Sequence, residues 1–137
     1  MIYKLEYYIQ KIPTEVIDII KYFVFFKPAT KEKLQNAVDL WYENEDDAVQ
    51  KYWDISLWDT SLITDMTRLF FRKLFFNSNI SKWDVSNVTS METMFYNCFS
   101  FNQPLNNWNV SNVTRMNGVF EKAEKFNQDI SNWDVSN

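Results

Sequence analysis

Apolar and polar positions recur along the second half of the chain with a period of 25 residues. Ile80 opens ISKWDVSNVTSMETMF and Leu105 opens LNNWNVSNVTRMNGVF, while Ile55 opens ISLWDTSLITDMTRLF and Ile130 opens ISNWDVSN. The register holds without an insertion. A fixed period of this size is typical of a solenoid, in which each unit buries its apolar side against its neighbours. The predicted units are 55–79, 80–104, 105–129 and a partial unit, 130–137.

Two hydrophobic periods alternate inside each unit. Trp83 and Val85 are apolar at every second position, which predicts a short strand. The segment 91–95 then has apolar residues at i, i+3 and i+4, which predicts a short helix, and Thr89 with Glu92 three residues on fits a capping box at its start. The sequence therefore predicts an α+β repeat solenoid with a short strand plus a short helix in every 25-residue unit.

Stacked units would place identical side chains in columns, with neighbouring strands about 4.8 Å apart. Because one unit cannot bury its apolar side alone, we expect these columns to form the core. The predicted structural ladder comprises Trp58, Trp83, Trp108 and Trp133, then Met66, Met91 and Met116, then Phe70, Phe95 and Phe120. In the first unit, 74–76 (Leu-Phe-Phe) thickens the apolar return loop, as expected of a unit that abuts a cap.

Residues 1–54 precede the repeats and show three helical patterns. Pro13 suits the first turn of a helix that ends before Lys27-Pro28. Thr30 is a suitable N-cap for a second helix, and a third short helix is predicted from Asp46 through Tyr52. We expect these helices to form an N-terminal cap over the exposed apolar edge of the first unit.

Composition excludes several functional classes. The net charge is -4, with no basic tract that would indicate nucleic-acid binding. Histidine is absent, which removes the commonest general base and metal ligand. The single cysteine, Cys98, occupies a variable slot of the repeat and has no histidine to activate it. We therefore expect a protein without enzymatic activity, catalytic residues, metal site or cofactor.

One polar slot of the repeat has two interpretations. Asp59, Asp84 and Asp134 share it with Asn109. Stacked carboxylates could bind calcium, whereas Asp or Asn side chains also accept hydrogen bonds from the backbone of turns. The asparagine in the middle of the column favours turn capping. We expect the Asn and Ser columns to satisfy turn backbone groups in the same way.

The N-terminal stretch offers no signal for export or membrane insertion. Charged residues interrupt its apolar positions, and the most apolar piece, 16–26, carries Asp18 and Lys21 and is too short to span a bilayer. We expect a cytoplasmic chain, with surface display left open.

The words WDVSNVTSMETMF and WNVSNVTRMNGVFEKAEKFNQD resemble the BspA-like leucine-rich-type repeat, a surface-protein repeat of about 25 residues found in mycoplasmas and lactic bacteria. The segment from Phe26, FKPATKEKLQNAVDLWYENEDDAVQKYWDISLWDTS, is similar to the leader that often precedes the first repeat in that family. This resemblance implies a solenoid used for binding or adhesion, with no catalytic residues.

A second resemblance lies at the N-terminus. QKIPTEVIDIIKYF is similar to the opening helix of an F-box, with Ile12, Pro13 and Glu15 placed as in that motif. It implies an F-box-like helix at 12–24 whose three named residues would bind the adaptor of a ubiquitin ligase.

These observations lead to three functional hypotheses. The first is a non-catalytic repeat scaffold that mediates protein–protein interaction with an unidentified protein partner. The alternatives are an F-box-like substrate adaptor for a ubiquitin ligase and a surface adhesion protein. Because the partial unit 130–137 lacks its predicted helix, we also expect an uncovered C-terminal end and a homodimer formed through it.

Overall fold

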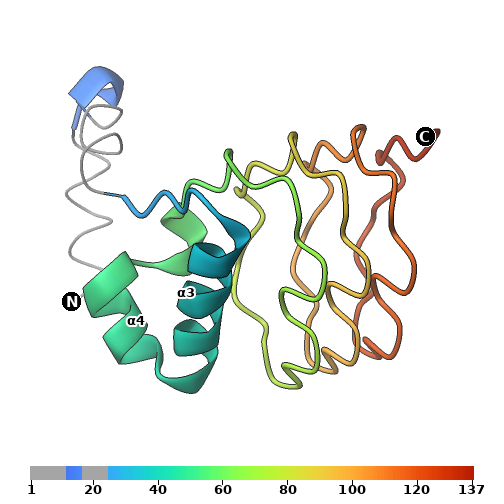
Figure 1. Ribbon diagram of the computed structural model, residues 1–137, viewed down its shortest axis with the longest axis horizontal. Helices are drawn as coiled ribbons and strands as arrows, with labels where there is room; N and C mark the ends of the chain where they lie inside the picture. The colour runs from blue at the N-terminus through green and yellow to red at the C-terminus, as the bar shows by residue number, and fades with distance from the viewer. Residues whose placement is uncertain (1–11, 17–24) are drawn as a thin grey trace.

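The computed structural model describes residues 12–16 and 25–137 of the chain. Its named elements are two α-helices, α3 (Lys31–Glu43) and α4 (Glu45–Tyr52), and a short 3₁₀ turn, η1 (Ile55–Leu57). Figure 1 shows α3 and α4 at one end, with the chain beyond them coiling in successive turns that lie side by side toward the C-terminus. The 25-residue units thus form a stack with helices on its N-terminal side.

The two helices begin where their capping residues predict. The backbone N–H of Lys33 donates to Thr30 Oγ1 at 3.3 Å, so Thr30 caps α3. Asn44 ends α3 by donating to the Leu40 carbonyl, and its side chain accepts from the Asp47 N–H to start α4. The prediction of a helix after Thr30 and of a second short helix before the repeats is confirmed.

The α+β class with a strand and a helix in each unit is wrong. Across 55–137, all of which the structure describes, there is no α-helix and no extended strand. Pairing between units registers only as isolated parallel bridges, Asp65 with Ser90 and Ser90 with Arg115. The units are coils of irregular backbone held together by hydrogen bonds and side-chain stacking.

Tight turns that bond to the next unit replace the predicted helix. Alternate N–H groups donate to carbonyls of the following unit at 2.8–2.9 Å, and those between them donate three residues back, as from Met94 to Met91 at 3.0 Å. Thr93 (φ 51°) and Asn97 (φ 56°) adopt left-handed backbone, which interrupts an α-helix. The Thr89 hydroxyl donates to the Thr64 carbonyl at 3.1 Å instead of capping a helix. The inter-unit pairs join Met91 to Arg115, Thr93 to Asn117, Phe95 to Val119 and Asn97 to Glu121.

Tight turns also lie on both sides of the segment that was predicted as a strand. The Trp83 N–H donates to the Ile80 carbonyl at 3.1 Å, and the Val88 N–H donates to the Val85 carbonyl at 2.9 Å. No strand lies between these turns. Trp83 and Val85 are nevertheless both buried, so the alternation marks core positions correctly.

The core is a set of stacked aromatic side chains from equivalent slots. Phe70 and Phe95 stack at 5.3 Å between ring centroids with planes 3° apart, and Phe95 and Phe120 stack at 5.5 Å and 6°. Trp58 stacks on Trp83 at 6.1 Å, and a parallel pair joins the last two units. That last pair is Trp108 with Trp133. In the methionine column, Met66 and Met91 are fully buried and Met116 is half-buried.

Candidate functional site

The shared Asp/Asn slot serves the turns of its own unit. In each unit the serine two residues on donates its backbone N–H to the slot's side-chain oxygen at 2.9–3.2 Å, which confirms the turn-capping prediction. The pairs are Asp59 with Ser61, Asp84 with Ser86, Asn109 with Ser111 and Asp134 with Ser136. Within the part of the chain that the structure describes, no group of three acidic or cysteine side chains is arranged to hold a metal ion.

A column of asparagines connects successive units. The Asn102 N–H donates to Asn77 Oδ1 at 2.9 Å, and the Asn127 N–H donates to Asn102 Oδ1 at the same distance. Gln103 and Gln128 add side-chain donors to the same acceptors. These amides satisfy backbone groups between units, as predicted, and so have a structural role.

Ion pairs fasten the segment before and within α3 to the first unit. Lys31 Nζ lies 3.0 Å from Asp65 Oδ2, and Lys27 Nζ lies 2.8 Å from Asp59 Oδ2. Burial alone would raise the pKa of Asp65, but hydrogen bonds from Thr67 and Lys31 outweigh it and lower that pKa below its ordinary value. The charged form of Asp65 is therefore stabilised by the folded structure.

Cys98 is a core residue. It is fully buried, and its Sγ donates to the Phe70 carbonyl at 2.9 Å. Burial raises the pKa of the thiol to about 12, so it stays protonated at neutral pH. It cannot act as a thiolate nucleophile.

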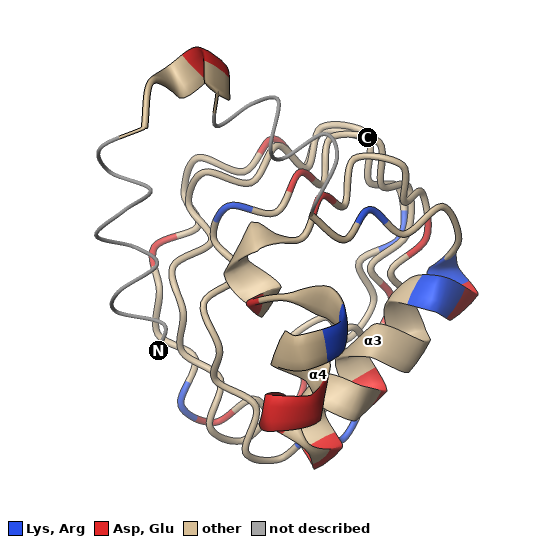
Figure 2. Ribbon diagram, turned by 90° about the vertical axis from the view of Figure 1, so that its left-hand side faces the viewer, with Lys and Arg blue, Asp and Glu red and all other residues tan. Residues whose placement is uncertain are grey.

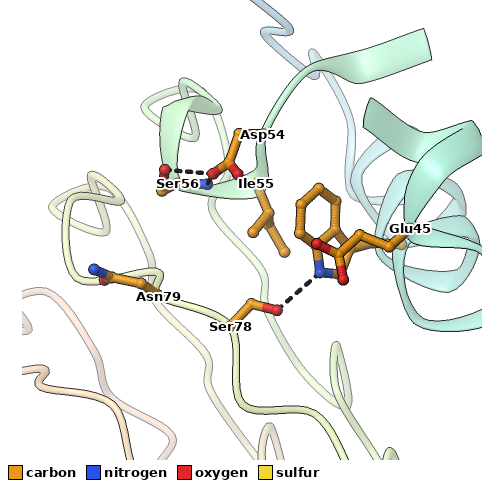
Figure 3. A pocket seen from close by; sticks show the side chains of 7 residues that line it. Glu45, Asp54, Ile55, Ser56, Ser78 and Asn79 are labelled. Atoms are coloured by element: carbon orange, nitrogen blue, oxygen red, sulfur yellow. Dashed lines mark hydrogen bonds between the residues drawn. The ribbon is translucent and has the colours of Figure 1, made fainter. Parts of the chain in front are cut away.

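A shallow pocket of about 340 Å³ lies where the helices meet the first unit (Figure 3). Trp41 Nε1 donates to Ser78 Oγ at 2.9 Å across it, and Asp54 accepts from the Ser56 N–H at 2.9 Å. These bonds use polar groups that would otherwise face a ligand. We therefore assign no chemistry to this pocket, which is lined by Trp41, Glu45, Asp54, Ile55, Ser56, Ser78 and Asn79.

Exposed apolar side chains gather at the outer bend of the first two units. Phe75 is 76% exposed, and Leu74 and Phe99 are each 38% exposed. The Ser100 N–H donates to the Leu74 carbonyl at 2.9 Å, which holds the two bends together. We call Leu74, Phe75 and Phe99 the apolar edge. Large apolar patches on a soluble surface mark interaction sites.

Aromatic and basic side chains also pack together across the first three units. Phe71 and Tyr96 stack at 5.0 Å with planes 14° apart. Arg68 lies 3.8 Å above the Phe71 ring, and Lys122 donates to the Tyr96 hydroxyl at 2.7 Å. At the apolar edge itself, Lys125 Nζ lies 5.3 Å from the centroid of the Phe99 ring.

The sequence predicted that the Leu-Phe-Phe segment at 74–76 thickens the apolar return loop, and it did not predict this exposed surface. Only Phe76 is buried, at 3% exposure. A usable signal was present, because Leu74 and Phe99 occupy the same slot of the repeat, one period apart, outside the predicted ladder.

Figure 2 shows the end of the molecule that carries the helices. Acidic residues mark the start of α4, where Glu45, Asp46 and Asp47 occupy the first turn and suit its positive dipole end. This patch is explained by helix stability.

The F-box-like residues lie in the short described segment 12–16. Ile12 is half-buried, and Pro13 and Glu15 are exposed. The Val16 N–H donates to the Pro13 carbonyl at 3.0 Å, which forms one helical turn. The rest of the predicted helix, 17–24, lies outside the described residues. None of the helices in the described part of the chain has the length and apolar character needed to cross a bilayer.

A comparison with protein families matches residues 33–137 to a family described as "Mycoplasma protein of unknown function, DUF285". The match begins within α3 and includes every repeat unit, so it covers well over half of the chain; the F-box-like segment 12–24 lies outside it. No curated protein and no solved structure matches the chain. The chain belongs to this mycoplasma family, DUF285.

Proposed function

We propose that the protein is a non-catalytic repeat scaffold that binds a partner protein through the apolar edge. The observation that carries this proposal is the exposure of Phe75, at 76%, beside Leu74 and Phe99 on adjacent bends. Burial of one such aromatic side chain contributes about 1.5–3 kcal/mol. Aromatic anchors of this kind are enriched at the centres of protein interfaces.

The framework beneath the edge supports binding. Phe76, the neighbour of Phe75, packs on Phe70 at 4.1 Å and on Phe101 at 5.7 Å between ring centroids. Its buried ring fixes the bend from which Phe75 projects. A surface held in place before binding loses less conformational entropy when a partner docks.

The test is affinity purification from the source cell with the intact chain and two matched variants. Phe75→Ser removes the anchor of the apolar edge, and Leu62→Ser removes a 51% exposed apolar residue from a different turn. We expect one protein to be retained by the parent chain and by Leu62→Ser, and to be reduced about tenfold or more with Phe75→Ser, the loss of about 1.4 kcal/mol. Equal retention by Phe75→Ser would overturn the proposal.

The F-box-like adaptor is the alternative. It draws support from the helical turn that starts at Pro13. It predicts binding to a Skp1-type protein that is lost when Pro13→Ala is combined with Glu15→Ala and retained with Phe75→Ser. No binding of a purified Skp1-type protein to the intact chain would contradict it.

Surface adhesion is the second alternative and uses the same apolar edge toward a partner outside the cell. A Phe75→Cys variant tests it, because the native Cys98 is fully buried. Adhesion predicts labelling of this variant on intact cells by a membrane-impermeant maleimide. Labelling only after lysis would contradict it.

A further inference from the structure

Two exposed arginines of the first unit lie beside a pair of stacked rings. Arg68 Cζ lies 3.8 Å from the centroid of the Phe71 ring, and Phe71 stacks on Tyr96 at 5.0 Å. The Arg72 N–H donates to the Tyr96 carbonyl at 2.8 Å, so Arg72 starts from the same place on the surface. The hydrogen bond with Tyr96 raises the pKa of Lys122, and the nearby positive charge of Arg72 opposes that rise. We call Arg68, Phe71, Arg72 and Tyr96 the basic patch.

Neither arginine has a counterion among the residues that the structure describes. Both side chains are exposed, and no described carboxylate forms an ion pair with Arg68 or Arg72. Three lysines in and before the first unit are neutralised instead, at 2.7–3.0 Å. Their pairs are Lys27 with Asp59, Lys31 with Asp65 and Lys73 with Asp39. The two guanidinium groups are therefore open to an anion from another molecule.

The backbone at these two slots of the repeat does not favour arginine. Both slots are left-handed in every full unit, with φ between 51° and 63°. The first slot holds Arg68, Thr93 and Gly118, and the second holds Arg72, Asn97 and Lys122. Glycine and asparagine adopt this conformation most readily, and Gly118 and Asn97 show that the slots accept them. What the first unit gains from arginine at both slots is therefore the side chain.

Contact with the Phe71 ring orients the guanidinium of Arg68 before any ligand binds. The ring lies against the face of the guanidinium, which leaves the N–H groups at its edge available to an acceptor. These N–H groups form a planar fork that matches the two oxygens of a carboxylate or a phosphate. Because the side chain is already held in place, it loses less conformational entropy on binding than a free arginine would. The basic patch is thus suited to binding oxyanions.

The rings of the patch argue against nucleic acid as the ligand. Single-stranded nucleic acid binds by stacking its bases on free aromatic faces. Here Arg68 and Tyr96 cover the faces of Phe71, while Phe71 and Lys122, whose Nζ lies 5.0 Å from the ring centroid, cover those of Tyr96. An anionic membrane attracts clusters of about four to eight basic residues, more than this patch holds. The arrangement instead suits a few carboxylates on a polypeptide.

We propose that Arg68 and Arg72 bind an acidic segment of another polypeptide, whose Asp or Glu carboxylates accept hydrogen bonds from the two guanidinium groups. The rings of Phe71 and Tyr96 hold the site in shape and do not themselves receive the ligand. None of the residues of the apolar edge belongs to the basic patch. The inference therefore goes beyond the proposed function and can fail or succeed independently of it.

Fluorescence anisotropy with the intact chain tests the proposal. The probe is a dye-labelled synthetic peptide of alternating Glu and Gly, and its control has Gln in place of every Glu. We expect the Glu peptide to bind about tenfold or more tightly than the Gln peptide, because charged acceptors form the stronger hydrogen bonds. Binding should weaken as the salt concentration rises toward about 1 M, since exposed charges are then screened. Equal binding of the two peptides would overturn the proposal.

Matched variants locate the binding site. Arg68→Gln combined with Arg72→Gln should weaken binding of the Glu peptide about tenfold, and Arg72→Gln alone, which keeps the contact with Phe71, about threefold. Lys33→Gln combined with Lys82→Gln removes the same charge from two exposed residues outside the patch and should leave binding unchanged.

Three results would overturn the proposal. The first is undiminished binding by the double arginine variant, and the second is an equal loss in the double lysine variant, which would show an effect of net charge alone. The third is tighter binding of an oligo-dT strand or of phosphatidylserine vesicles than of the Glu peptide. Phe75→Ser should bind the Glu peptide as the parent chain does, so the outcome at the apolar edge is read separately.

Discussion

Truncation of Phe95 to alanine should be among the most costly substitutions in the stack. Its ring is fully buried between Phe70 at 5.3 Å and Phe120 at 5.5 Å, and it also packs on Phe101 at 4.2 Å. Phe→Ala in a close-packed core costs about 3–5 kcal/mol, because burial is lost and a cavity remains. We expect about 4 kcal/mol for Phe95→Ala, which for a chain of this size lowers the melting temperature by about 12–16 °C.

Phe120→Ala is the matched control for this prediction. Phe120 holds the same slot one unit later, but it is half-buried. A half-buried ring has less buried apolar area to lose when it is truncated, so the expected loss in the free energy of unfolding is about 2 kcal/mol. Urea unfolding followed by tryptophan fluorescence and circular dichroism measures both, with unchanged slope required for the comparison. Equal costs, or a larger cost for Phe120→Ala, would refute the stacked-core interpretation.

Three further predictions follow from individual contacts. Gln35→Leu removes the side-chain donor to the Leu69 carbonyl and should lower the free energy of unfolding by about 1 kcal/mol in the same urea assay; an unchanged value would contradict the capping role. The lowered pKa of Asp65 in the fold contributes stability that is present above the unfolded value of 3.8 and is lost as the pH falls through the folded pKa. In Asp65→Asn the melting temperature should therefore fall less steeply as the pH is lowered into the acid range. An unchanged acid dependence would refute the stabilising role of the Asp65 carboxylate. Cys98, whose thiol pKa is raised to about 12 by burial, should react with a thiol reagent at pH 8 only after unfolding, and rapid labelling of the native chain would contradict its burial.

The repeat and its buried slots were readable from the sequence because they depend on composition at fixed spacing. Trp83, Val85 and Met91 are all buried, and both apolar periods identify core positions. Thr30 and the acidic residues before Tyr52 also marked the helices, because capping is a local property of the chain. Patterns of apolar residues therefore located the core even where they misidentified the backbone.

Backbone conformation could not be obtained from the same pattern. A spacing of i, i+3 and i+4 places apolar residues on one face of an α-helix. A series of tight turns, each closed by a hydrogen bond three residues back, can direct the same residues toward the core. The sequence of one unit does not show that Thr93 and Asn97 have positive φ, because that choice is stabilised by the next unit's carbonyls. Hydrogen bonds between residues 24 positions apart therefore stabilise this series of turns in place of the helix that the local sequence favours.

The same non-local bonding explains why the apolar edge was not predicted from the sequence. The apolar edge arises only when Leu74 and Phe99, a full period apart, are brought onto adjacent bends. In the first unit the Leu69 carbonyl corresponds to those of Met94 and Val119, which accept from a preceding unit, so it needs a donor from elsewhere in the fold. Gln35 Nε2 of α3 supplies that donor at 3.0 Å, a contact across 34 residues that no pattern within one unit indicates.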